Sequence, residues 1–276
     1  MAVIGIPIAV AAGYAGDLVL AALLSLLAGL GAWELFRFTR EGGAPALEAI
    51  GIPLAALMPL GAHAFRIGWL DAPLAAGGAV FVALTGVVLW ARSPTERPLG
   101  SIAVTVFGVL YTGGTLGYAY ALRHHRFVVE PGAGAVLLFF PIALTWVSDS
   151  GAYFVGRALG KRNLMPAVSP GKTVAGAVGG ITATMIGAWL YNGFVLRPLA
   201  ELALAPWTAL AFGAVISVVG QVGDLVESLF KREAGVKDSS TFFSAHGGVI
   251  DRLDSLYFAI PVAYLILGRL LLAAPR

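Results

Sequence analysis

Long apolar runs, separated by short polar or helix-breaking segments, make up almost the whole chain. A helix needs roughly 20 apolar residues to cross a bilayer, and nine runs are candidate spans, of which the first is short. They lie near residues 2–14, 17–36, 47–66, 72–91, 100–122, 133–154, 174–194, 206–230 and 250–273. In the seventh run, Gly176 and Gly180 form a small-xxx-small face suited to close helix packing. The pattern predicts an all-α, polytopic integral membrane protein with about nine transmembrane helices.

Composition narrows the class of protein further. Of 276 residues, 58% are hydrophobic and 12% are charged, whereas a soluble domain carries about 25% charged residues. Polar stretches are too short to form a soluble domain. The chain has no cysteine, which excludes disulfides, thiolate metal sites and a cysteine nucleophile.

Lysine and arginine in short loops predict the orientation, because cytoplasmic loops carry an excess of both. With the N-terminus inside, the inside loops hold eleven of these residues: Arg37, Arg40, Arg92, Arg97, Arg157, Lys161, Arg162, Lys172, Lys231, Arg232 and Lys237. The other side holds six: Arg66, Arg123, Arg126, Arg197, Arg269 and Arg276. All four lysines fall in two inside loops, 155–173 and 231–249. We therefore predict the N-terminus in, the C-terminus out, and an active site at the cytoplasmic membrane face.

The first of these loops, 155–173, follows Asp149 and ends in Ser169-Pro170-Gly171-Lys172-Thr173. It is excluded as a Walker A loop, because Pro166 stands where that motif needs glycine and an apolar helix, rather than a strand, is expected before it. A Lys-Thr pair at a helix N-terminus can still hold phosphate, since free N–H groups and the helix dipole favour anions. The alternative is an ordinary basic loop that touches anionic lipid headgroups.

The second loop, 231–249, joins two helix ends that carry carboxylates. Asp224 and Glu227 are three residues apart, as are Asp251 and Asp254, so each pair shares one helix face. Oxygen ligands without cysteine point to Mg²⁺ rather than Zn²⁺. The alternative is that the second pair binds a neighbouring arginine or caps its helix.

The run from Ser228 to Asp254 resembles, position for position, the signature of the phosphatidate cytidylyltransferases, also called CDP-diacylglycerol synthases. That signature reads Ser-x-x-Lys-Arg, four residues, Lys-Asp, and then His-Gly-Gly-x-x-Asp-Arg-x-Asp, and every fixed residue is present here. The upstream segments Asp149–Tyr153, Ser169–Thr173 and Gly223–Ser228 are similar to the family as well, so the resemblance covers roughly residues 145–256. One departure is Ala175, where the family usually has a polar side chain.

The resemblance implies roles for individual residues. The predicted catalytic set is Lys231, Arg232, Lys237, Asp238, His246 and Arg252. The predicted substrate-binding set is Asp149, Ser169, Lys172, Thr173, Gly247 and Gly248. The predicted metal ligands are Asp224, Glu227, Asp251 and Asp254. Residues 1–130 would then be N-terminal transmembrane helices, and residues 131–276 the catalytic transmembrane domain.

The implied reaction of phospholipid biosynthesis is CTP plus phosphatidic acid giving CDP-diacylglycerol and pyrophosphate. The lipid phosphate is already anionic near neutral pH, so the chemistry needs cations rather than a general base. Basic side chains and Mg²⁺, with a second cation left open, would offset the repulsion between phosphates. The resemblance implies a homodimer in the inner (cytoplasmic) membrane of a bacterial-type cell, with CTP and phosphatidic acid as partners and no nucleic acid. Two alternatives are a CTP-dependent polyprenol kinase and a membrane transporter.

Overall fold

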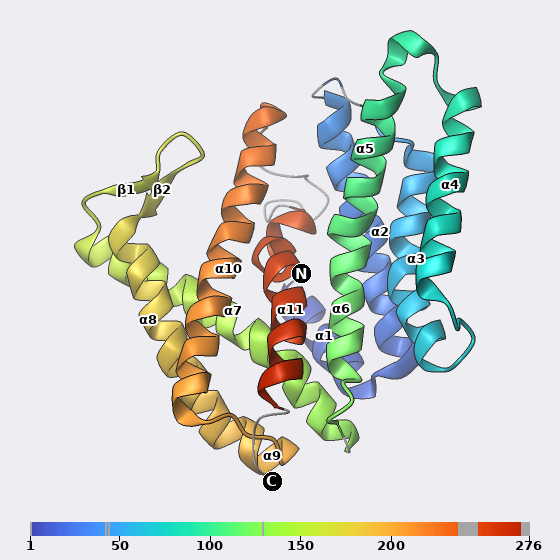
Figure 1. The fold of residues 1–276 in the computed structure, drawn as a ribbon. Coiled ribbons are helices and arrows are strands. Elements are labelled where there is room, and N and C mark those ends of the chain that lie inside the picture. The colour runs from blue at the N-terminus through green and yellow to red at the C-terminus, as the bar shows by residue number, and fades with distance from the viewer. Residues whose placement is uncertain (1, 42, 44, 129, 237–247, 272–276) are drawn as a thin grey trace. The chain divides into compact units, whose positions relative to one another are not determined.

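The computed structural model describes residues 2–41, 43, 45–128, 130–236 and 248–271, and nearly all of them are helical (Figure 1). Within these residues, eight helical segments are long and apolar enough to cross a membrane. They are Asp17–Arg40, Glu48–Arg66, Leu74–Ala91, Pro98–Arg123, Gly132–Leu159, Val174–Ala200, Pro206–Glu233 and Ile250–Leu270. The predicted fold class is confirmed: apart from one short hairpin, the described chain is an all-α, multi-pass membrane protein.

The first predicted span differs from the others. Helix α1 (Ala2–Ala15) has 14 residues and therefore rises about 21 Å. The hydrocarbon core of a bilayer is about 30 Å thick. Among the described residues, the nine predicted spans thus become eight of full length and one shorter apolar helix.

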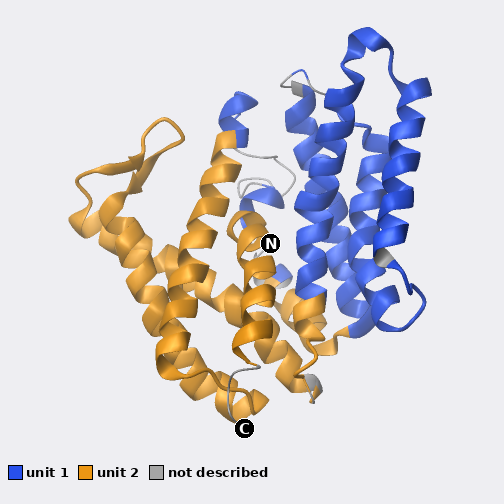
Figure 2. Cartoon of the chain, viewed as in Figure 1, with its two compact units in different colours: residues 1–5, 17–120, 230–252 blue, residues 6–16, 121–229, 253–276 orange. Residues whose placement is uncertain are grey.

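Contacts divide the chain into two compact units (Figure 2). Unit 1 comprises Met1–Gly5, Asp17–Tyr120 and Phe230–Arg252, and unit 2 comprises Ile6–Gly16, Ala121–Leu229 and Leu253–Arg276. Helices α10 (Pro206–Glu233) and α11 (Ile250–Leu270) belong partly to each unit. The predicted division at residue 130 concerns where the chemistry lies, and it stays a prediction.

Unit 1 is built on one group of helices: α2 (Asp17–Glu41), α3 (Glu48–Arg66), α4 (Pro73–Ala91), a 3₁₀ turn (Pro94–Glu96), α5 (Pro98–Gly108) and α6 (Thr115–Arg123). A π-helical turn, Val109–Gly114, joins α5 to α6 as one continuous segment. Gly113 of this turn packs on α3, where a Cβ would collide with the carbonyl oxygen of Ala55. Phe36 of α2 is fully buried in the same core cluster as Ala55. These contacts hold α2, α3 and the π-helical turn together.

Unit 2 holds most of α1, α10 and α11, together with α7 (Pro131–Leu159), α8 (Val174–Tyr191), a π-helical turn (Asn192–Leu196) and α9 (Arg197–Ala200). Helices α7 and α8 pack closely through small residues. A Cβ on Gly176 would lie 2.8 Å from the carbonyl oxygen of Ala152, and one on Gly180 would lie 2.9 Å from that of Ser148. Both glycines therefore face α7, which confirms the predicted small-residue face.

A two-stranded antiparallel hairpin, β1 (Asn163–Met165) and β2 (Ser169–Thr173), fills the connection between α7 and α8 (Figure 1). The expectation that a helix precedes Lys172 was wrong, because this polar connection satisfies its backbone groups by pairing with itself. The Walker A motif is still excluded. The loop of that motif would run from residue 166 to Lys172, but Pro166 stands in place of its first glycine and residues 169–173 form strand β2.

We expect Gly213→Leu to lower the thermal stability of the protein. Helix α10 packs on α8 at Gly213, where a Cβ would lie 2.5 Å from the carbonyl oxygen of Thr184 and 2.8 Å from the Cβ of Ala188. Overpacking of this kind typically costs about 1–3 kcal/mol. Thermal unfolding in detergent micelles measures the effect. The matched control is Gly77→Leu, since nothing lies within 4 Å of a Cβ at Gly77. Equal melting temperatures for the two variants would contradict this packing.

Candidate active site

A cavity of about 450 Å³ in unit 2 collects four of the predicted site residues. Helix α7, the hairpin, the start of α8 and the second half of α10 supply its lining. The predicted members are Asp149, Lys172, Thr173 and Asp224. The volume lies within the range of small-molecule sites. The sequence therefore identified part of a real cavity from three separate segments.

The charged groups of this cavity are paired across it. Lys172, near the end of β2, forms an ion pair with Asp224 of α10. Their side chains are 28% and 29% exposed, so water screens the pair only in part. Asp149 of α7 interacts electrostatically with both of them. The cavity thus presents two carboxylates, the ammonium group of Lys172 and the guanidinium group of Arg157 to whatever occupies it.

Thr173 is the N-cap residue of α8. Its Oγ1 accepts a hydrogen bond from the N–H of Gly176 at 3.1 Å. Since Thr173 also lines the cavity, the positive end of the α8 dipole lies at the cavity wall, an arrangement that favours anions. Ser169 stands at the other end of β2, opposite Met165, and is not among the cavity-lining residues.

Of the remaining predicted metal ligands, Asp254 belongs with the carboxylates of unit 2. Its charge interacts with those of Asp224 and Asp149. The reason is a close approach of α10 to α11, where a Cβ on Gly223 would lie 2.7 Å from the carbonyl oxygen of Asp254. Glu227, one turn after Asp224, is only 1% exposed. The structure therefore brings Asp254 toward the cavity carboxylates and buries Glu227 within the helix packing.

A second group of predicted residues lies in unit 1, where α10 ends and α11 begins. The Nζ of Lys231 lies 2.9 Å from Oδ1 of Asp251, and the two side chains are 14% and 15% exposed. The other oxygen of Asp251 accepts a hydrogen bond from the N–H of Gly248 at 2.7 Å. Asp251 thus holds the backbone two residues before the first residue of α11, in addition to forming the ion pair. Arg232 and Arg252, the neighbours of the pair in sequence, are exposed.

Four of the predicted site residues lie outside the described residues. They are Lys237, Asp238, His246 and Gly247.

Three polar residues of the cavity lining, Tyr153, Arg157 and Gln221, were missed by the sequence analysis. Arg157 donates a hydrogen bond to the hydroxyl of Tyr153 at 2.8 Å, and both line the cavity. Gln221 also lines it, and its Nε2 donates to the carbonyl oxygen of Ala177 at 3.2 Å. The position of Gln221, three residues before Asp224 on one helix face, was the signal that could have identified it.

The carboxylates of unit 2 suit a Mg²⁺ ion that the substrate helps to bind. Mg²⁺ in phosphate-transfer sites is usually held by one or two carboxylates plus substrate phosphates. Within the described part of the chain, no three acidic or histidine side chains gather closely enough to form a metal site by themselves. Asp149, Asp224 and Asp254 nevertheless interact through their charges, and Lys172 offsets them only in part. This all-oxygen, excess-negative set fits Mg²⁺ completed by phosphate oxygens.

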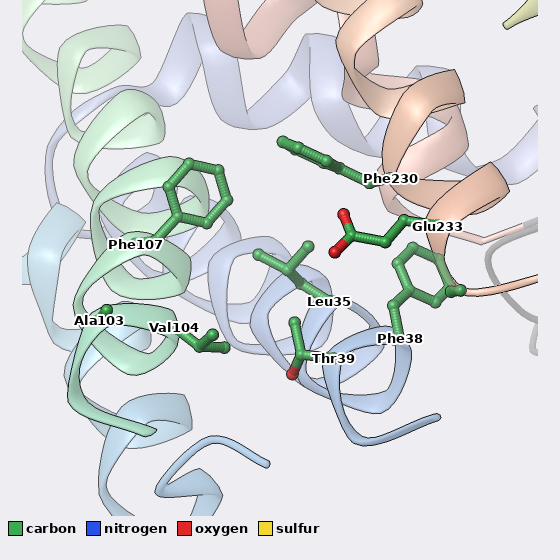
Figure 3. Close-up of a pocket in the computed structure, with 9 residues that line it drawn as sticks. Leu35, Phe38, Thr39, Ala103, Val104, Phe107, Phe230 and Glu233 are labelled. Carbon is green, nitrogen blue, oxygen red and sulfur yellow. The ribbon is translucent and has the colours of Figure 1, made fainter. Parts of the chain in front are cut away.

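Unit 1 has a cavity of a different kind, with a volume of about 320 Å³ (Figure 3). Leu35, Phe38, Phe107 and Phe230 form much of its wall, and the carboxylate of Glu233 lies among them. Apart from the hydroxyl of Thr39, the side chains of this lining offer no hydrogen-bond donor for phosphates, and the carboxylate would repel them. A nucleotide therefore suits the cavity of unit 2 and not this one.

Comparisons with known proteins agree on one family. The family described as "Cytidylyltransferase family" matches residues 1–270. A phosphatidate cytidylyltransferase of Haemophilus influenzae is 38% identical over 173 residues, which are 62% of this chain and 57% of the relative. The Bacillus subtilis protein of the same name is 37% identical, over 69% of this chain and 66% of its own length. The Staphylococcus saprophyticus one is 37% identical, over 60% and 58% respectively. The matched region thus spans less than two thirds of each of these relatives.

Proposed function

Because the chain belongs to the cytidylyltransferase family, we propose that it transfers the CMP moiety of CTP to phosphatidic acid and releases pyrophosphate. Relatives at 37–38% identity carry the name phosphatidate cytidylyltransferase. The structural observation that carries the proposal is the cavity of unit 2. There a lysine, two carboxylates and a helix N-terminus line one small-molecule cavity, as a reaction on metal-bound phosphates requires.

The proposed chemistry is a displacement at phosphorus. A phosphate oxygen of phosphatidic acid attacks the α-phosphorus of CTP, the bond from that phosphorus to the bridging oxygen breaks, and pyrophosphate leaves with the bonding electrons. The second pKa of a phosphate monoester is about 6, so the attacking oxygen needs no base. The obstacle is repulsion, since two like unit charges 4 Å apart repel by about 4 kcal/mol at an effective dielectric of 20.

Different basic groups of the chain would bind the phosphates of the nucleotide and of the lipid. In unit 2, Lys172 and the N-terminus of α8 would hold nucleotide phosphates, and Arg157 adds a further cation to the cavity lining. In unit 1, Lys231, held by Asp251, would neutralise a phosphate at the start of α11. Arg232 and Arg252, both exposed, would do the same for the approaching anions.

We propose Asp224, with Asp149 or Asp254, as the residues that would hold Mg²⁺. When bound, the ion supplies positive charge that offsets the phosphate charges as the α-phosphorus is attacked. Glu227 and Asp251 stay predictions as ligands. Glu227 is almost completely buried, and both oxygens of Asp251 already bind protein groups.

The proposal is tested by incubating purified protein with phosphatidic acid and CTP, labelled in one arm at the α-phosphate and in the other at the γ-phosphate. We expect a CDP-lipid labelled from the α-phosphate, one pyrophosphate for each lipid formed, and loss of product when Mg²⁺ is chelated. Release of CDP with transfer of the γ-phosphate would show a lipid kinase instead. If neither product forms in several detergents and in liposomes, the proposed function is wrong.

We further propose that the loops 155–173 and 231–249 face the cytoplasm of a bacterial-type cell, in its inner membrane. Helix α11 then starts inside and ends outside, whether or not α1 crosses the membrane. The predicted inside N-terminus, in contrast, requires α1 to cross. The homodimer implied by the resemblance stays a prediction.

A reporter fused after Arg276 and active only in the cytoplasm should therefore be silent. The physical reason is the excess of lysine and arginine in the loop that precedes α11. The same reporter inserted after Arg162 should be active, which makes it the control for expression and folding. Activity of the C-terminal fusion would overturn this topology.

A further inference from the structure

Glu34 is an acidic residue buried inside a membrane-spanning helix of unit 1. It lies in α2 between Trp33 and Leu35, and its exposed fraction is 1%. Among the described residues, Glu34 and Glu227 are the only acidic residues that are buried. Burying a carboxylate away from water is costly, and ionisable groups in transmembrane segments mark functional sites by default. Glu34 lies outside the region that the motifs cover.

The partner of Glu34 explains why a carboxylate is tolerated at this position. Its Oε2 accepts a hydrogen bond from the N–H of Ile250 at 2.9 Å, across 216 positions of sequence. Ile250 is the first residue of α11, and the first N–H groups of a helix have no acceptor within it. Hydrogen bonds from a backbone N–H to a charged carboxylate are among the strong ones, and the helix dipole adds to the attraction.

The hydrogen bond lies beside the ion pair of the candidate site. Asp251 follows Ile250 directly, and it binds both Lys231 and the N–H of Gly248. Val249 and Ile250 are 2% and 1% exposed, so the side chains of this turn are packed against the rest of the protein. Two carboxylates, from α2 and from α11 itself, thus hold the backbone where α11 starts.

We propose that Glu34 is a positioning residue for the transfer reaction. By holding the N–H of Ile250 it fixes the first turn of α11, and through that turn it fixes the direction of Asp251 and of the Lys231 bound to it. Glu34 acts through the helix and not on the phosphates. The inference rests on the proposed function for its effect on rate, but the hold on α11 is a separate physical claim.

Two variants of Glu34 separate the roles of its oxygen and its size. Glu34→Leu removes the acceptor, and we expect kcat to fall about 10–100-fold, as for other groups that orient a site residue, with KM for CTP changed less than about threefold. Glu34→Gln keeps an oxygen acceptor and should retain more of kcat than Glu34→Leu. The control is Glu48→Gln, a carboxylate paired with Arg40 near the surface of the same unit, which should match the wild type.

Amide hydrogen exchange of the detergent-solubilised protein supplies a readout that does not depend on activity. In Glu34→Leu the amide of Ile250 should exchange at least about tenfold faster, because it loses a strong acceptor, while amides in the middle of α11 keep their protection. Unchanged exchange at Ile250 would overturn the proposal, as would wild-type kcat in a folded Glu34→Leu protein.

A variant on the donor side covers the case in which Glu34→Leu does not fold. Ile250→Pro removes the N–H, and proline is well tolerated at the first position of a helix. It should reproduce the loss of kcat, and combining it with Glu34→Gln should add little further loss. Full activity of Ile250→Pro would overturn the proposal. If the wild type forms no CDP-lipid, the proposed function fails while the exchange comparison still decides whether Glu34 holds α11.

Discussion

Asp224→Asn is expected to lower the rate of CDP-lipid formation about 10²–10³-fold while the protein stays folded. Asp224 lines the cavity of unit 2, pairs with Lys172 and interacts with the charge of Asp254. Asparagine keeps the shape of the side chain but removes the negative charge that would hold Mg²⁺. This loss of rate corresponds to about 3–4 kcal/mol for the lost metal contact, since each tenfold in rate corresponds to about 1.4 kcal/mol.

The measurement is the initial rate across a Mg²⁺ titration, with folding checked by size-exclusion chromatography and thermal unfolding. Asp71→Asn is the matched control, because Asp71 is exposed and lies outside both cavities. It should leave the rate unchanged. Activity of Asp224→Asn within tenfold of wild type at low Mg²⁺ would remove Asp224 from the set of metal ligands.

Asp251→Asn is expected to lower the rate of CDP-lipid formation strongly as well, but for a different reason. The ion pair with Lys231 is mostly shielded from water, and removing one partner of a buried pair leaves the other charge uncompensated. The lysine would then turn away from the phosphates or destabilise the start of α11. We expect a loss of rate of more than about 10²-fold, with a lower melting temperature.

A double variant separates stability from chemistry at this pair. Asp251→Asn combined with Lys231→Met removes both charges, so the melting temperature should recover relative to the single variant. The rate should stay low, because the cation that we propose to neutralise a substrate phosphate is gone. Recovery of the rate together with the melting temperature would show that the pair is purely structural. Asp251 would then only hold the backbone before α11.

The helices of this protein could be read from its sequence because their signal is local. Eight predicted spans match the described helical segments, since about 20 consecutive apolar residues can hardly fold in any other way in a bilayer. The packing face at Gly176 and Gly180 was also predictable, because residues four apart lie on one side of a helix. The family resemblance singled out the motifs that contain Lys172, Thr173 and Asp224. These three residues line one cavity in the structure.

The features that could not be predicted from the sequence depend on contacts between distant segments. The hairpin of β1 and β2 forms in a connection without alternating apolar residues, so no strand pattern marks it. The cavity residues Tyr153 and Gln221 line one cavity because α7 and α10 approach each other, as the hydrogen bond between Ser148 and Ser217 shows. The bond from Ile250 to Glu34 joins residues 216 positions apart, and no local pattern contains such a pairing. Glu34 was visible only as one acidic residue in an apolar run.

The close contact of α7 and α8 affects how easily this pair of helices can be deformed. Where Gly176 and Gly180 face α7, backbone meets backbone, and there is no layer of flexible side chains between the helices that could swell or be invaded by acyl chains. We therefore expect this part of the contact between α7 and α8 to resist deformation by the surrounding lipid. The cavity residues that the two helices carry should then keep their spacing when membrane fluidity changes.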